Sequence, residues 1–94
     1  MSGTVVRIPT PLRRVTNGQD KVEIDGDTLG QIIEAMDSTY TGFKDRLVAE
    51  EGEIRYFVNI YLNGEDVRFL QGMETSTKMG DELSIVPAVA GGAT

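Results

Sequence analysis

The sequence predicts an α+β fold in which one main helix packs across a mixed β-sheet. Two observations favour this class. Several short segments alternate apolar with polar side chains and are rich in β-branched residues, whereas one longer segment has the apolar spacing of a helix. The chain has 94 residues, 39% of them hydrophobic, so it can form one small core. A lone sheet in so small a domain needs a helix over its apolar face.

The first two strands are expected at residues 4–8 and 21–24, as a hairpin with a wide loop. The first segment is short, β-branched and alternating. Pro9 and Pro11 end it, because proline has no N–H for the ladder and restricts the residue before it. The pair Asn17-Gly18 is a turn signal that leads into the second strand.

The main helix is expected to begin after Thr28, because Thr28 and Gln31 have the spacing of a capping box. Apolar residues then follow at helical spacing and predict a stripe that faces the sheet: Leu29, Ile32, Ile33 and Met36. The helical pattern fails near residues 39–42. A second, short helical turn is expected over residues 43–47.

The longest strand is expected over residues 54–62. Its alternation predicts an aliphatic face toward the helix and a second face with two aromatic residues. The first face carries Tyr56, Val58, Ile60 and Leu62, and the second carries Phe57, Asn59 and Tyr61. Asn63-Gly64 predicts a tight hairpin, and residues 67–70 supply the returning strand. After an irregular crossover, Gly80-Asp81 opens the last strand.

The expected order is therefore hairpin, helix, strand pair, crossover and final strand. This is the order of the β-grasp, the ubiquitin fold, although other small α+β domains share parts of it. We expect a β-grasp domain over residues 1–87. Residues 88–94 are expected to form a flexible C-terminal tail that carries Gly91-Gly92.

The composition excludes several kinds of site. A net charge of −6 argues against a nucleic-acid binder, which needs clustered Lys and Arg. The chain has no Cys and no His, so it has no disulfide, thiolate nucleophile or imidazole metal ligand. We expect no metal site. No segment has the length of apolar sequence that a membrane span or a signal peptide requires, and a cytoplasmic protein is expected.

The end of the chain resembles the ThiS/MoaD sulfur carriers, ubiquitin-like proteins in which a Gly-Asp turn opens the last strand and a proline leads to a C-terminal Gly-Gly. Residues 80–92 carry this pattern and read GDELSIVPAVAGG. Residues 57–69, which read FVNIYLNGEDVRF, are similar to the CysO-type carriers of actinobacteria, as is Thr28-Leu29-Gly30. The resemblance spans nearly the whole chain.

The resemblance implies a carrier, not an enzyme, with no catalytic residue and no bound cofactor of its own. An E1-like (ThiF/MoeB-type) enzyme would use ATP to adenylate the Gly92 carboxylate, and sulfur would displace AMP to leave a thiocarboxylate. A sulfur-accepting synthase would then take the sulfur, for cysteine or another sulfur-containing metabolite. Ala90, Gly91 and Gly92 form the end of the tail, and glycine suits a narrow adenylation cleft because it has no Cβ.

The chain departs from the family pattern at Ala93-Thr94. Reactive members end at the second glycine, so this chain is expected to be inactive until the bond between Gly92 and Ala93 is cut. A zinc-dependent protease of the JAMM type is the expected partner for that step. The alternative is that the two residues are an addition to the natural chain.

Partner binding is expected on the sheet face that the helix leaves open. Phe57, Tyr61 and Val86 form the expected apolar patch there, with Leu70 at its border. The resemblance implies that the activating enzyme docks near Leu70 and Val86. Scattered exposed apolar residues are, however, normal on protein surfaces.

Other functions remain open at this point. The chain could be a ubiquitin-like modifier joined to lysines through Gly92, the small subunit of a molybdopterin-synthase-type complex, or a β-grasp binding module with an incidental tail. An enzyme is the least favoured option, because the 15 carboxylates show no spacing that marks a catalytic pair.

Overall fold

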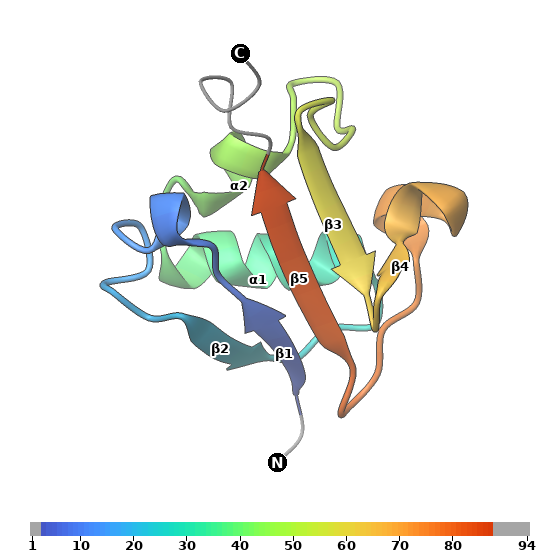
Figure 1. Cartoon of the computed structure of the whole chain (residues 1–94), viewed down its shortest axis with the longest axis horizontal. Helices are drawn as coiled ribbons and strands as arrows, with labels where there is room; N and C mark the ends of the chain where they lie inside the picture. The colour runs from blue at the N-terminus through green and yellow to red at the C-terminus, as the bar shows by residue number, and fades with distance from the viewer. Residues whose placement is uncertain (1–2, 88–94) are drawn as a thin grey trace.

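The computed structural model describes residues 3–87 of the chain. A five-stranded sheet with strand order β2-β1-β5-β3-β4 is crossed on one face by α1 (Figure 1). The elements in chain order, with η for a 3₁₀ helix, are β1 (Thr4–Arg7), η1 (Thr10–Leu12), β2 (Lys21–Ile24), α1 (Leu29–Thr39), α2 (Phe43–Leu47), β3 (Val58–Leu62), β4 (Glu65–Asp66), η2 (Val67–Phe69), η3 (Gly72–Glu74) and β5 (Glu82–Pro87). In this described part, no helix has the length and apolar character needed to cross a membrane.

The last strand of the chain is the centre of the sheet. β5 runs parallel to β1 on one side and antiparallel to β3 on the other, and the two edges are β2 and β4. Leu83 pairs with Val6 of β1, and Ile85 pairs with Ile60 of β3. This arrangement confirms the predicted mixed sheet with one main helix packed across it.

The main helix begins where the sequence predicts. The Gln31 backbone N–H donates to Thr28 Oγ1 at 3.2 Å, which caps the start of α1. The Asp27 N–H donates to the Gln31 side-chain oxygen at 2.9 Å, one residue before the position that a capping box uses. The predicted apolar stripe is buried against the sheet: Leu29, Ile32, Ile33 and Met36.

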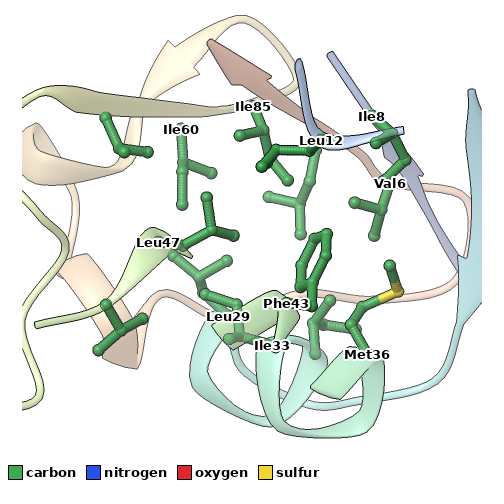
Figure 2. Close-up of a cluster of buried hydrophobic side chains, with 14 of the residues drawn as sticks. Val6, Ile8, Leu12, Leu29, Ile33, Met36, Phe43, Leu47, Ile60 and Ile85 are labelled. Carbon is green, nitrogen blue, oxygen red and sulfur yellow. The ribbon is translucent and has the colours of Figure 1, made fainter. Parts of the chain in front are cut away.

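Phe43 lies at the centre of the core. It is the first residue of α2, and its ring is fully buried between α1 and the sheet (Figure 2). Asp37 of α1 fixes this second helix, because its Oδ1 accepts the backbone N–H of Gly42 at 3.1 Å and that of Lys44 at 3.0 Å. The other core residues, apart from the α1 stripe, are Val6, Ile8, Leu12, Leu47, Val48, Val58, Ile60, Val67, Leu83 and Ile85.

The strand predicted over residues 54–62 is too long, because β3 begins at Val58. Ile54 forms an isolated antiparallel bridge with Val48, and the Arg55 N–H donates to the Leu47 carbonyl at 2.9 Å. The chain therefore folds back against the end of α2 instead of extending the sheet. Tyr56 lies in the turn that follows and is 91% exposed, so its predicted place on the aliphatic face is wrong.

The strand predicted over residues 67–70 is also wrong. Asn63 and Gly64 form the predicted tight turn, with φ angles of 50° and 91°. The returning strand, β4, has only two residues and is followed by η2. The Arg68 N–H donates to the Asp66 carboxylate at 2.9 Å, and this local bond favours a 3₁₀ turn over further pairing with β3.

Candidate functional site

The residues predicted to carry the chemistry, Ala90, Gly91, Gly92 and Ala93, lie outside the described residues. The structure does define the strand from which they continue. β5 pairs with β1 only as far as Ser84, whereas it pairs with β3 as far as Pro87, opposite Val58. The end of β5 is therefore held by a strand on one side, and among the described residues it has no strand on the other.

The open face of the sheet, the side away from α1, is mostly polar. In β1, β3 and β5 it carries Val5, Arg7, Asn59, Tyr61, Glu82, Ser84 and Val86. Arg7 and Glu82 form an ion pair on it. Val86 is 46% exposed, and Tyr61 is partly buried on the neighbouring strand. The register places Val86 opposite Asn59 and Tyr61 opposite Ser84, so Tyr61 and Val86, two of the predicted docking residues, share one face in diagonal positions.

Phe57 and Leu70, the other two predicted docking residues, lie outside the strands. Phe57 is in the turn before β3, where its ring meets the Tyr56 ring edge-on with centroids 5.4 Å apart. Leu70 follows η2 and is partly exposed. The single strand predicted through residue 57 would have aligned Phe57 with Tyr61, and the early turn removes that alignment. Partner binding by these residues stays a prediction.

Phe57 instead lines an apolar cleft that the sequence did not predict. This cleft, which we call the end cleft, has a volume of about 310 Å³ and lies where β5 finishes. Its lining comes from η1, α2, the start of β3 and the end of β5: Pro11, Leu12, Arg46, Leu47, Phe57, Val58 and Pro87. Leu12 and Leu47 are also members of the buried core. No local pattern could have indicated this cleft, because its walls come from separate segments.

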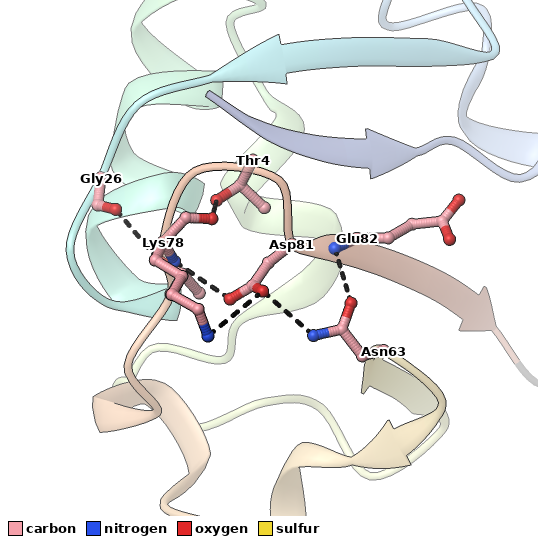
Figure 3. A network of polar contacts seen from close by, with 7 residues as sticks. Thr4, Gly26, Asn63, Lys78, Asp81 and Glu82 are labelled. Carbon is pink, nitrogen blue, oxygen red and sulfur yellow. Dashed lines mark hydrogen bonds and ion pairs between the residues drawn. The ribbon is translucent and has the colours of Figure 1, made fainter. Parts of the chain in front are cut away.

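A polar network fixes the opposite end of β5 (Figure 3). Asn63 donates from Nδ2 to Asp81 Oδ1 at 3.1 Å, and its Oδ1 accepts the Glu82 N–H at 3.0 Å. The Lys78 backbone N–H donates to Asp81 Oδ2 at 3.0 Å, and Thr4 Oγ1 donates to the Lys78 carbonyl at 3.1 Å. The network thus joins the β3–β4 turn, the crossover and β1 to the residue before β5.

Asp81 is the centre of this network and is only 7% exposed. Burial by itself would raise the pKa of its carboxyl group. The hydrogen bonds from Asn63 and from the Lys78 backbone, together with the Lys78 charge, outweigh burial and lower the pKa below its ordinary value. The Gly-Asp turn predicted to open the last strand therefore holds an ionised, hydrogen-bonded carboxylate at that position.

Among residues 3–87, no group of three Asp, Glu, His or Cys side chains is arranged to hold a metal ion. The described features are a central strand, a polar network at its start and an apolar cleft at its end. Together with a sequence that continues to Gly-Gly, they define a small β-grasp protein of the ubiquitin-like class.

Comparison with known proteins gives the family. The model of the ThiS family matches residues 6–92, and the chain belongs to that family. The chain is 48% identical over 89 residues to the sulfur carrier protein CysO of Mycobacterium tuberculosis, covering 93% of this chain and 96% of that protein. These matches confirm the predicted family and its CysO-type branch, and they support a sulfur carrier role.

Two further proteins are similar to this chain. CysO in the crystal structure of the Amycolatopsis orientalis BexX/CysO complex superposes with a TM-score of 0.89 at 48% identity, covering 93% of this chain and 97% of that chain. The small archaeal modifier protein 3 of Haloferax volcanii is 40% identical over 68 residues, which is 72% of this chain and 73% of that protein. The predicted β-grasp fold is confirmed, and both carriers and modifiers are among the relatives.

Proposed function

We propose that this protein carries sulfur as a thiocarboxylate on Gly92. The observation that carries the proposal is the extent of the family match, which ends at the second glycine of the pair and leaves Ala93-Thr94 beyond it. In this family the terminal glycine is the reactive residue, so the match supports the same role for Gly92.

The chemistry requires a partner enzyme that binds ATP and delivers the sulfur nucleophile. A Gly92 carboxylate oxygen attacks the α-phosphorus of ATP, and pyrophosphate leaves. Hydrosulfide then attacks the acyl carbon, and AMP leaves with the electrons of the broken C–O bond. The products are a thiocarboxylate and AMP. An E1-like adenylating enzyme performs these steps, and the carrier contributes an acyl group that no side chain shields.

The geometry of β5 supports a carrier that presents its C-terminal segment to a separate enzyme. A central strand with a fixed start can present a short segment in a constant direction, which favours entry of the segment into another protein's active site. Gly92 is the fifth residue after Pro87, so Gly92 can lie at most about 17 Å from the end of β5. The partner must therefore contact the body of the carrier close to that end.

We propose that the activating enzyme and the sulfur-accepting synthase dock on Tyr61 and Val86, with contributions from Phe57 and Leu70. Exposure of Val86 and Phe57 near the end of β5 supports this surface. The crystallised complex of a related CysO with BexX supports docking by a protein of this fold. The sulfur acceptor is proposed as a synthase for cysteine or another sulfur-containing metabolite.

The proposal includes trimming of the precursor. While Ala93-Thr94 is attached, the Gly92 carbonyl belongs to a peptide bond and has no carboxylate to adenylate. A JAMM-type metalloprotease that cuts between Gly92 and Ala93 would release the reactive group.

A second candidate function is a ubiquitin-like modifier that is joined to lysines through Gly92. The match to the small archaeal modifier protein 3 favours this alternative. Both functions need adenylation, but only the modifier ends as an isopeptide adduct on another protein. The small subunit of a molybdopterin-synthase-type complex is a special case of the first function, with a different sulfur acceptor.

The test is an intact-mass spectrum of the untagged protein recovered from its native cells under sulfur limitation. A species that ends at Gly92 with one oxygen replaced by sulfur is the expected result. Lysine adducts without any thiocarboxylate would favour the modifier. Recovery of only the full chain ending in Thr94 would overturn both trimming and sulfur carriage.

A further inference from the structure

We propose that the edge strand β2 pairs with β2 of a second copy of this chain, so that two sheets join across a twofold axis. β2 is an outer strand with β1 on one side only (Figure 1). Among residues 3–87, no strand pairs with its free side. The other outer strand, β4, has only two residues before η2 begins, so it offers less backbone for pairing.

The free side of β2 presents the backbone groups of Lys21 and Glu23. The Ile8 N–H donates to the Asp20 carbonyl at 2.9 Å, so the Asp20 backbone faces β1. Backbone direction alternates along an antiparallel pair, so Val22 also bonds to β1, whereas the N–H and C=O groups of Lys21 and Glu23 point away from it. Unpaired groups of this kind are a template for a further strand.

The two charges select one register for the pair. If the twofold axis passes through Val22, Lys21 of each copy lies opposite Glu23 of the other, and each such pair exchanges two backbone hydrogen bonds. Moving the axis by one residue, to Lys21 or to Glu23, would place like charges directly opposite each other, which is unfavourable. A second copy of β2 is therefore complementary in charge to this edge.

Neither charge has a partner within its own sheet. Both side chains are exposed, and neither takes part in the ion pairs of the described residues. β1 places Arg7, a like charge, opposite Lys21, and Val5 opposite Glu23. Arg7 is itself paired with Glu82 on the far side of β1. Pairing of two β2 strands would give Lys21 a carboxylate and Glu23 an ammonium group on the neighbouring strand.

The two Val22 side chains would meet at the axis, on the α1 side of the joined sheet. Val22 is only partly buried in one copy and packs against the core. At this position the Cα atoms of a pair lie about 4.5 Å apart, so the side chains touch and lose their remaining water contact. The contact is short and the net charge of −6 on each copy opposes it, so we expect a dissociation constant of about 0.1–1 mM.

Pairing at β2 would leave the proposed docking residues free. β1 lies between β2 and β5, and joining two sheets edge to edge covers neither face of β5. The inference therefore does not depend on sulfur carriage, and it is tested without the activating enzyme.

The first experiment is NMR on a mixture of isotope-labelled and unlabelled full-length chain at about 1 mM. We expect an intermolecular nuclear Overhauser contact between the Val22 Hα atoms of the two copies, which only the register centred on Val22 gives. Amide exchange at Lys21 and Glu23 should also slow as the protein concentration rises. Slowed exchange without the Val22 contact would assign this edge to a different strand and overturn the proposal.

The second experiment is sedimentation equilibrium with charge-swap variants. Lys21→Glu and Glu23→Lys should each weaken dimerisation about tenfold, because each change acts twice in a symmetric pair. The combined variant should return to within about threefold of the parent, and an equimolar mixture of the two single variants should form heterodimers. Glu51→Lys is the matched control, because it changes the net charge as Glu23→Lys does but lies outside β2 and should not weaken the dimer.

Two outcomes of sedimentation would overturn the proposal. One is a monomer at every concentration up to about 1 mM. The other is a dimer whose affinity is unchanged in both single variants, because its interface would then lie elsewhere. All four substitutions are on exposed side chains, so amide spectra that match the parent are expected and check that the fold is intact. None of these outcomes bears on thiocarboxylate formation.

Discussion

The end at which β5 begins is polar and closely bonded, whereas the end at which it finishes is apolar and partly open. At the start, the Asp81 and Asn63 side chains are hydrogen-bonded to each other, to the backbone N–H of Lys78 in the crossover and to the backbone N–H of Glu82 in β5. Among the described residues, no buried side-chain polar atom lacks a partner. At the finish, Val86 and Phe57 remain substantially exposed, and the end cleft is unfilled by any described side chain.

The difference indicates how a small carrier can combine a stable fold with a surface that binds partner proteins. Fixing the start of a strand by directional bonds sets the strand's position, because hydrogen bonds tolerate little displacement. An apolar end accepts different partner surfaces, because burial of apolar area is not directional. We therefore expect substitutions at the start of β5 to change stability, and substitutions near its finish to change partner reactions.

The largest effect is expected at Gly92, beyond the finish of the strand. In a chain trimmed to end at residue 92, Gly92→Val should slow adenylation by about a hundredfold or more, because a branched side chain next to the acyl carbon misplaces it in a narrow cleft. Pyrophosphate release by the adenylating enzyme measures this rate. Unfolding by urea should show a free energy within about 0.5 kcal/mol of the parent. Equal adenylation rates would contradict the role given to glycine.

Removal of Ala93-Thr94 is the matched gain-of-function experiment. The full chain should show no adenylation, and the chain ending at Gly92 should be competent. Activity in the full chain without cleavage would contradict the precursor interpretation.

The next largest effect is on stability and is expected at the start of β5. Asp81→Ala should lower the free energy of unfolding by about 3 kcal/mol, because the Asn63 amide and the Lys78 N–H lose a charged acceptor. Asp25→Ala, which removes an exposed carboxylate, should change it by less than about 0.5 kcal/mol. Urea unfolding followed by circular dichroism measures both.

The Asp81 effect should depend on pH in a definite direction. Because the folded pKa of Asp81 is lowered, its charge contributes fully to stability above the ordinary carboxyl value of 3.8 and progressively less as the pH falls through the folded value. The difference between wild type and Asp81→Ala should therefore be constant near neutral pH and should narrow below 3.8. A difference that grows on acidification would contradict the assignment.

A smaller effect, on partner binding, is expected near the apolar end of β5. Val86→Asp should weaken binding of the adenylating enzyme by about tenfold, since a carboxylate must be desolvated in the contact. Calorimetric titration with the trimmed carrier measures it, and Val86→Thr, which keeps the branched shape, should bind more tightly than the Asp variant. Unchanged affinity in both variants would remove Val86 from the docking surface.

The smallest effect is at the turn before β5. Gly80 has a φ of 91°, and a Cβ placed there would meet no atom within 4 Å, so the cost of substitution is purely conformational. Gly80→Ala should lower the free energy of unfolding by about 1 kcal/mol, and Gly80→Asn by less, because Asn tolerates this region better. Equal losses in the two variants, compared by urea unfolding, would point to a steric cause instead.

Much of the local structure could be predicted from sequence because it depends on near neighbours. The cap at Thr28 and the apolar stripe of α1 follow from helical geometry alone. β2 and α2 have the predicted bounds, and β1 ends one residue earlier than predicted. The two longer strand predictions were wrong where local contacts favoured another conformation. The Asp66 carboxylate accepts the Arg68 N–H and stabilises η2, and Ile54 pairs with Val48 instead of extending β3.

By itself, the sequence determined the fold class, the family and the Gly-Gly pattern, because periodicity and motifs depend on residues that are close together in the sequence. Only the tertiary structure decided that Asp81 meets Asn63, 18 residues away, and that Phe57 leaves the sheet to line the end cleft. These contacts join segments whose separation in sequence carries no information about distance. They are fixed by how the sheet and helices pack, which no single stretch of residues specifies.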